Sequence, residues 1–146
     1  MIKSGDFTNL ASDYMKYRPS YNKDVVKLIL SGVNKDIDTI KVADVGAGTG
    51  IFTKCLIDAG VKNFIAVEPN DNMRGSGIKF LGKKFNFLKG SAEETELGSN
   101  SFDLVTMASS FHWPNTSEAL KEFDRILLSK GVFSALWNPR LTERSA

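Results

Sequence analysis

Three glycines at alternate positions follow a short apolar stretch and could bind a ligand through the backbone. Gly46, Gly48 and Gly50 lie in the run Asp-Val-Gly-Ala-Gly-Thr-Gly, which is residues 44–50. Glycine has no Cβ and adopts left-handed conformations readily, so this loop can turn tightly and leave its backbone accessible. A helix after the loop would point free N–H groups and its positive dipole end at the ligand. The run therefore predicts a loop that binds a ligand, with a strand before it and a helix after it.

The glycine spacing differs from that of dinucleotide-binding proteins. Their G-x-G-x-x-G fingerprint, counted from Gly46, requires a glycine where Ile51 stands. An acidic residue, Glu68, follows Gly50 by 18 residues at the end of the next apolar run. A carboxylate there can accept hydrogen bonds from both hydroxyls of a ribose. Glu68 could instead be a solvated loop residue, but the glycine loop upstream favours the ribose interpretation.

Together, the D-x-G-x-G-x-G run and Glu68 resemble motif I and the acidic loop of class I S-adenosylmethionine (SAM) dependent methyltransferases. Within that family the chain resembles the small-molecule branch, which includes ubiquinone/menaquinone-type and trans-aconitate-type enzymes. The resemblance covers about residues 7–140 and implies SAM as cofactor and a small-molecule methyl acceptor. In this region it implies that the cofactor is bound by Asp44, Gly46, Ala47, Gly48, Thr49, Gly50, Glu68, Pro69 and Met73.

Two further segments resemble cofactor-binding parts of this family. Residues 90–94 (Gly-Ser-Ala-Glu-Glu) resemble the loop that holds the adenine edge, which implies roles for Ser91, Ala92 and Glu93. They could equally form an acidic surface loop. Near the N-terminus, Tyr14 and Arg18 lie one helical turn apart. A tyrosine hydroxyl and an arginine guanidinium suit a carboxylate of SAM or of the substrate. The helix expected over residues 6–18, which carries both side chains, could instead serve only for packing.

The acceptor side of the site is predicted after the fourth strand. Ligands of doubly wound sheets lie beyond the carboxyl ends of the strands, which places Ser109 and the residues up to Trp113 over the transferable methyl group. His112 is the chain's one histidine and could act as a general base or orient the substrate. It could also be a structural histidine beside Trp113. Cys55 is interpreted as a small core residue, because no basic group is placed to activate it.

The elements that must position these residues alternate between strands and helices. Strands are expected at 41–45, 63–67, 85–88, 101–107 and 132–137, and helices at 6–18, 22–33, 49–59, from residue 72, and at 116–128. The pattern predicts an α/β, Rossmann-like, doubly wound and mostly parallel sheet with helices on both faces. The resemblance implies strand order 3-2-1-4-5. The chain is expected to be one SAM-binding domain, with a helical lid segment at 1–35 and the core at 36–146.

The family normally continues with further helices and strands 6 and 7, which this sequence lacks. The edge of strand five is therefore expected to be unpaired, which indicates either a C-terminally truncated fragment or an edge that a second copy or another chain covers. For this reason a non-catalytic SAM-binding or interaction module remains an alternative function. A nicotinamide oxidoreductase is less favoured, because Ile51 breaks the fingerprint and no Tyr-x-x-x-Lys pair is present.

Composition excludes several other classes. The 146 residues are 42% hydrophobic and 25% charged, with a net charge of +2, which is too weak to favour nucleic acid. No apolar run reaches the roughly 20 residues of a membrane span. One cysteine and one histidine cannot build a His/Cys metal site, so no metal is expected. A single cysteine is compatible with a reducing compartment, and a cytoplasmic location is expected.

Overall fold

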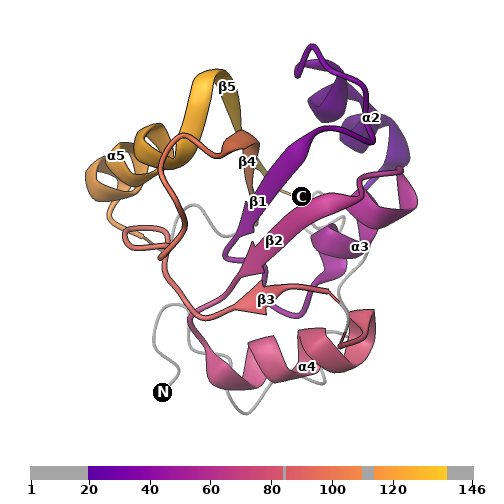
Figure 1. The fold of residues 1–146 in the computed structure, drawn as a ribbon. Helices are drawn as coiled ribbons and strands as arrows, with labels where there is room; N and C mark the ends of the chain where they lie inside the picture. Colours follow the sequence, from indigo (N-terminus) through magenta and orange to yellow (C-terminus); the bar gives the residue numbers. More distant parts are fainter. Residues whose placement is uncertain (1–19, 84, 110–113, 138–146) are drawn as a thin grey trace, which may run out of the picture.

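The protein is built around a five-stranded parallel sheet (Figure 1). The computed structural model describes residues 20–83, 85–109 and 114–137. Within them the strand order is β3-β2-β1-β4-β5, and every neighbouring pair is parallel. The strands are β1 (Lys41–Val45), β2 (Asn63–Val67), β3 (Phe87–Leu88), β4 (Phe102–Ala108) and β5 (Leu127–Leu136). The predicted fold class and strand order are confirmed.

Four helices are described, and an asparagine directly before the first residue caps three of them. They are α2 (Lys23–Ser31), α3 (Ile51–Asp58), α4 (Asp71–Leu81) and α5 (Thr116–Ile126). The side chains of Asn22, Asn70 and Asn115 accept a backbone N–H in the first turn of α2, α4 and α5. This is the usual way to satisfy N–H groups that have no partner inside the helix. The fourth helix, α3, begins at Gly50 and has no side-chain cap.

Two hydrophobic clusters lie on opposite faces of the sheet. Val42 of β1 belongs to a cluster with side chains of α2 and α3, whereas Ala43 and Val45 belong to a cluster with side chains of α5. Side chains alternate between faces along a strand, so this division assigns each helix to its face. Figure 1 shows α5 across the sheet from α3, as a doubly wound fold requires.

The boundary between the last helix and the last strand was predicted wrongly. A helix was expected over residues 116–128 and a strand over 132–137, but α5 ends at Ile126 and β5 begins at the next residue. Leu127 has an extended backbone (φ −76°, ψ 144°) and pairs with Phe102 of β4. The apolar residues after Ile126 fit both patterns, and pairing with β4 decides between them. The register then shifts before Leu104 pairs with Val132.

Two glycines of α4 provide a matched test of this packing. A Cβ at Gly77 would lie 2.4 Å from the buried ring of Phe87, whereas a Cβ at Gly75 would meet no heavy atom within 4 Å. We expect Gly77→Ala to lower the free energy of unfolding by about 1–3 kcal/mol through overpacking. Gly75→Ala should raise it by about 0.5–1 kcal/mol through the unfolded-chain entropy. Urea unfolding measures both, and equal shifts would contradict the packing of β3 against α4.

Candidate functional site

The glycine loop lies where predicted, at the carboxyl end of β1 and the start of α3. Gly46, Gly48 and Gly50 have φ values of 66°, 61° and 88°, in the left-handed region that glycine tolerates. The N–H of Ala47 donates to the carbonyl of Val67 at the end of β2 (3.0 Å). The loop is thus fixed to the neighbouring strand at the sheet edge where doubly wound proteins bind ligands.

Glu68 lies directly beside this loop. Its Oε1 accepts the N–H of Gly48 (2.7 Å), and its Oε2 accepts the N–H of Asn70 (2.9 Å). The side chain of Arg74 donates to the Glu68 carbonyl (3.0 Å). Burial raises the pKa of the Glu68 carboxyl above its usual value, while the N–H bonds from Asn70 and Gly48 and the charge of Arg74 act against that shift. Each carboxylate oxygen still has a lone pair for another donor.

Asp44 sits behind the loop and faces the core. It is 1% exposed, and its two oxygens accept the hydroxyls of Thr53 on α3 (2.6 Å) and Thr106 on β4 (2.9 Å). Burial is the largest cause that raises the pKa of Asp44 to about 6. The two threonine bonds lower it, and the charge of Glu68 raises it further. The two hydrogen bonds of Asp44 therefore connect α3 and β4 to β1 directly behind the loop.

Thr49 and the start of α3 supply polar groups that the described part of the chain leaves unsatisfied. The Thr49 side chain is 1% exposed, and its Oγ1 has no hydrogen-bond partner within residues 20–83, 85–109 and 114–137. Buried hydroxyls normally have one, so this atom requires an explanation such as a bound ligand. Gly50, as the N-cap of α3, offers no side-chain acceptor to the helix N–H groups. Within the described residues, the Thr49 hydroxyl therefore has no partner and the first turn of α3 has no side-chain cap.

The loop predicted to hold an adenine edge follows β3. Ala92 is 6% exposed, and the Ser91 hydroxyl accepts the N–H of Glu94 (3.1 Å). The exposed Glu93 carboxylate accepts the N–H of Asn115 (2.8 Å), at the cap of α5. One oxygen of Glu93 is thus used to fix the loop to α5, which the sequence interpretation did not anticipate.

The other predicted cofactor residues differ in their surroundings. Pro69 is exposed after β2, whereas Met73 in the first turn of α4 is 3% exposed, with its N–H bound to Asn70 Oδ1 (2.9 Å). Tyr14, Arg18 and His112 lie outside the described residues.

Ser109 is found at the end of β4 and has a partner that the sequence did not reveal. Its Oγ lies 2.6 Å from the hydroxyl of Tyr21. Tyr21 stands in the tyrosine-rich run 14–21 beside the predicted lid residues. That run was the available signal, but only the fold shows that Tyr21 meets the end of β4.

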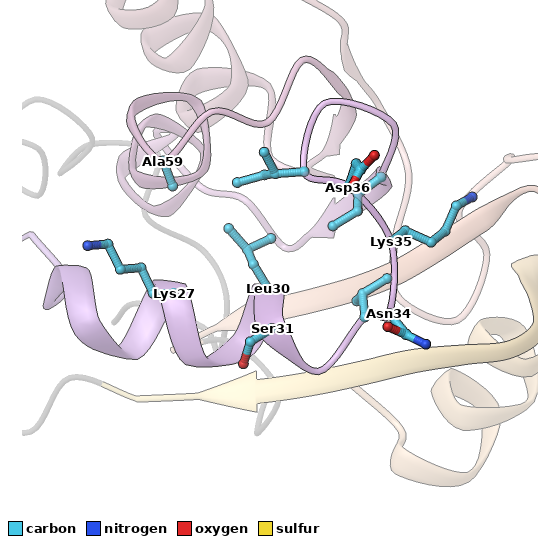
Figure 2. Close-up of a pocket in the computed structure, with 10 residues that line it drawn as sticks. Lys27, Leu30, Ser31, Asn34, Lys35, Asp36 and Ala59 are labelled. Carbon is cyan, nitrogen blue, oxygen red and sulfur yellow. The ribbon is translucent and has the colours of Figure 1, made fainter.

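A cavity of about 500 Å³ lies away from these residues (Figure 2). Figure 2 shows side chains of α2 and of the following loop around it, and Ile40 just before β1 contributes to its wall. This is the amino end of β1, whereas the glycine loop follows its carboxyl end. None of the predicted site residues lines this cavity, so it is separate from the candidate site.

Comparison with known proteins agrees with this geometry. The family model described as a methyltransferase domain matches residues 43–135. The chain belongs to the class I SAM-dependent methyltransferases. It is 35% identical to an uncharacterized methyltransferase-like protein of Schizosaccharomyces pombe, over 92% of this chain and 52% of that protein. It is 32% identical to the malonyl-[acyl-carrier protein] O-methyltransferase of Geobacter sulfurreducens, over 85% of this chain and 48% of that protein.

A solved structure has the same fold. It is a SAM-dependent methyltransferase of Thermotoga maritima, described as a possible histamine N-methyltransferase, with a TM-score of 0.67 and 25% identity over 88% of this chain and 58% of that one. This methyltransferase chain spans about half the length of the curated relatives it matches. In the described segments, no helix combines the length and apolar character needed to cross a membrane.

The site residues fit the cofactor that this family implies. SAM carries a ribose, an amino acid and a cationic sulfonium. The Glu68 oxygens have lone pairs for ribose hydroxyls, and the N-terminus of α3 and the buried Thr49 hydroxyl offer donors for a carboxylate. These three features can bind the ribose and the carboxylate of such a cofactor.

Replacing Asp44 tests the cost of its burial. Because its folded-state pKa of about 6 exceeds the ordinary aspartate value of 3.8, the folded state binds more protons between these pH values. Stability from this group should therefore fall as pH rises from about 4 to about 6, by about 3 kcal/mol, and then level off. Asp44→Asn should lack this decline. Urea unfolding across pH measures the difference between wild type and variant, and a constant difference would contradict the raised pKa.

Thr53→Val provides the companion test. It removes a hydrogen bond that lowers the pKa of Asp44, so the decline should extend to higher pH. An unchanged upper limit of the decline would show that Thr53 does not stabilise the carboxylate.

Proposed function

We propose that this methyltransferase binds SAM at the carboxyl ends of β1 and β2 and transfers its methyl group to a small-molecule acceptor. The observation that carries the proposal is the Glu68 carboxylate, held by the N–H groups of Gly48 and Asn70 beside the glycine loop. Those two bonds fix the carboxylate in one orientation while leaving a lone pair on each oxygen. A preorganised acceptor pair of this kind suits the two hydroxyls of a ribose.

The remaining cofactor contacts follow from the positions around Glu68. The glycine loop and the first N–H groups of α3 would bind the amino-acid part of SAM, with Thr49 as a further donor. Met73 would pack under the adenosine, and the loop of Ser91 and Ala92 would meet the adenine edge. Tyr14 and Arg18 are proposed to cover the cofactor from the N-terminal segment.

SAM would supply an electrophilic methyl group, whose transfer in line to the acceptor breaks the carbon–sulfur bond and releases S-adenosylhomocysteine. The chain's own residues then have to align the acceptor, exclude water and remove a proton where the acceptor carries one. We assign the proton-accepting role to His112, which comes after β4 in the sequence. Asp44 contributes through the loop that it supports.

Two relatives support a small acceptor. One is named for a malonyl group on acyl-carrier protein and the other as a possible histamine N-methyltransferase. The first name indicates transfer to oxygen and the second transfer to nitrogen. A small acyl or amine acceptor is therefore favoured for this chain, without a choice between the two atoms.

Calorimetric titration with SAM tests the cofactor assignment. Wild type should bind SAM saturably and should not bind NADH. Glu68→Gln should weaken SAM binding about 10- to 100-fold, because it removes a charged acceptor from the site. The matched control is Glu118→Gln, which replaces an exposed glutamate on α5 that pairs with Lys121 and should bind like wild type. Undiminished binding by Glu68→Gln, or binding of NADH by wild type, would refute the assignment.

His112→Ala separates binding from turnover. Its SAM affinity should stay within about twofold of wild type, while the rate of S-adenosylhomocysteine formation should fall about 10²- to 10⁴-fold, as expected for loss of a general base. The assay uses a panel of small carboxylic acids and amines as acceptors. A variant that turns over as fast as wild type would remove His112 from the mechanism.

A further inference from the structure

Tyr21 and Ser109 join two parts of the chain that are 88 residues apart. Their hydroxyl oxygens lie 2.6 Å from each other, a normal distance for a hydroxyl–hydroxyl bond. Tyr21 stands two residues before α2, and Ser109 directly follows β4. The bond therefore fixes the entry to the first described helix against the end of a central strand.

Ser109 is held in an unusual conformation. Its φ is +60°, in the left-handed region that non-glycine residues seldom adopt. Its N–H donates to the carbonyl of Leu136, the last residue of β5, at 2.6 Å. Residues in such conformations persist where the surroundings fix them, and they cluster at functional sites. Here β5 fixes the backbone of Ser109 and Tyr21 fixes its side chain.

The ring of Tyr21 connects this junction to the glycine loop. It is 8% exposed and packs edge-to-face on Phe52, with ring centroids 5.2 Å apart and an interplanar angle of 86°. Phe52 lies in the first turn of α3, two residues after Gly50. Tyr21 thus contacts the helix that begins at the cofactor loop and, through its hydroxyl, the residue that begins the acceptor side.

The hydrogen bond between Tyr21 and Ser109 lies at the point where the strand order reverses. The glycine loop follows β1 and Ser109 follows β4, and these two strands are neighbours at the centre of the sheet. In doubly wound folds the ligand lies in the crevice at that switch point. Three residues after Ser109 the sequence reaches His112.

We propose that Tyr21 is a positioning residue that, through Ser109, fixes the end of β4 relative to the glycine loop and the start of α3. The inference rests on the proposed SAM site, whose shape Tyr21 would maintain without being a motif residue. SAM affinity should therefore depend on the hydroxyl–hydroxyl bond.

SAM titration of single and double variants provides the test. Tyr21→Phe and Ser109→Ala should each weaken SAM binding about two- to tenfold, the effect of one net hydrogen bond. If Tyr21 acts through Ser109, the double variant should bind no more weakly than either single variant. Additive losses, or SAM affinity unchanged in Tyr21→Phe, would overturn the proposal. The control is Ser101→Ala at the opposite end of β4, where the hydroxyl donates to the Ser99 carbonyl, and it should bind like wild type.

Ser109→Gly distinguishes positioning from stability. Glycine adopts a φ of +60° without strain, so this variant should unfold at higher urea concentration than Ser109→Ala. It nevertheless lacks the hydroxyl, and its SAM affinity should fall as in Ser109→Ala. A merely structural role predicts that affinity follows stability, and wild-type affinity in Ser109→Gly would therefore refute the proposal.

Amide hydrogen exchange provides a readout without ligand. Peptides that cover the carboxyl end of β4 up to Ser109 should exchange faster in Tyr21→Phe than in wild type, whereas Ser101→Ala should leave them unchanged. Equal exchange in Tyr21→Phe and wild type would overturn the inference. If wild type failed to bind SAM, the proposed function would fall, and the exchange comparison would still decide whether Tyr21 orders the end of β4.

Discussion

The carboxylate of Asp44 is buried without a cationic partner in the described part of the chain, and the arrangement of the site depends on how it is satisfied. A buried carboxylate is tolerated when its oxygens are hydrogen-bonded, and here Thr53 and Thr106 bind one oxygen each. Because those threonines belong to α3 and β4, the two bonds fix both elements relative to β1. The position of the glycine loop between β1 and α3 therefore depends on the hydrogen bonds of the buried Asp44 carboxylate.

Carboxylates also fix other segments of the chain, at both edges of the sheet. Glu68 binds the glycine loop and the turn before α4. Glu122 of α5 accepts both the N–H and the hydroxyl of Thr95, and its pKa is lowered to about 2, chiefly by its bond with Arg125. Arg125 in turn donates to the carbonyl of Leu97 (2.7 Å). The segment after β3 is thus held to α5 by charge-assisted bonds, which are stronger than neutral ones.

Local pattern was sufficient to predict much of this structure. The bounds of β1 and β2 match their predicted ranges, because their apolar runs are short and are delimited by glycine, proline and asparagine. The bond from Gly48 to Glu68 agrees with the predicted proximity of loop and acid. Patterns failed where two structures fit the same residues. Leu127 continued the helical period, and only pairing with Phe102 made it a strand residue.

The sequence by itself determined the fold class, the strand order through its family resemblance, and the glycine loop with its acidic partner, because each depends on residue types at short or fixed spacing. Tertiary structure alone decided that Asp44 faces the core between two threonines and that Tyr21 meets Ser109. Those contacts join residues up to 88 positions apart. Strand register and helix packing determine which residues meet, and neither can be read from the spacing of residues along the chain.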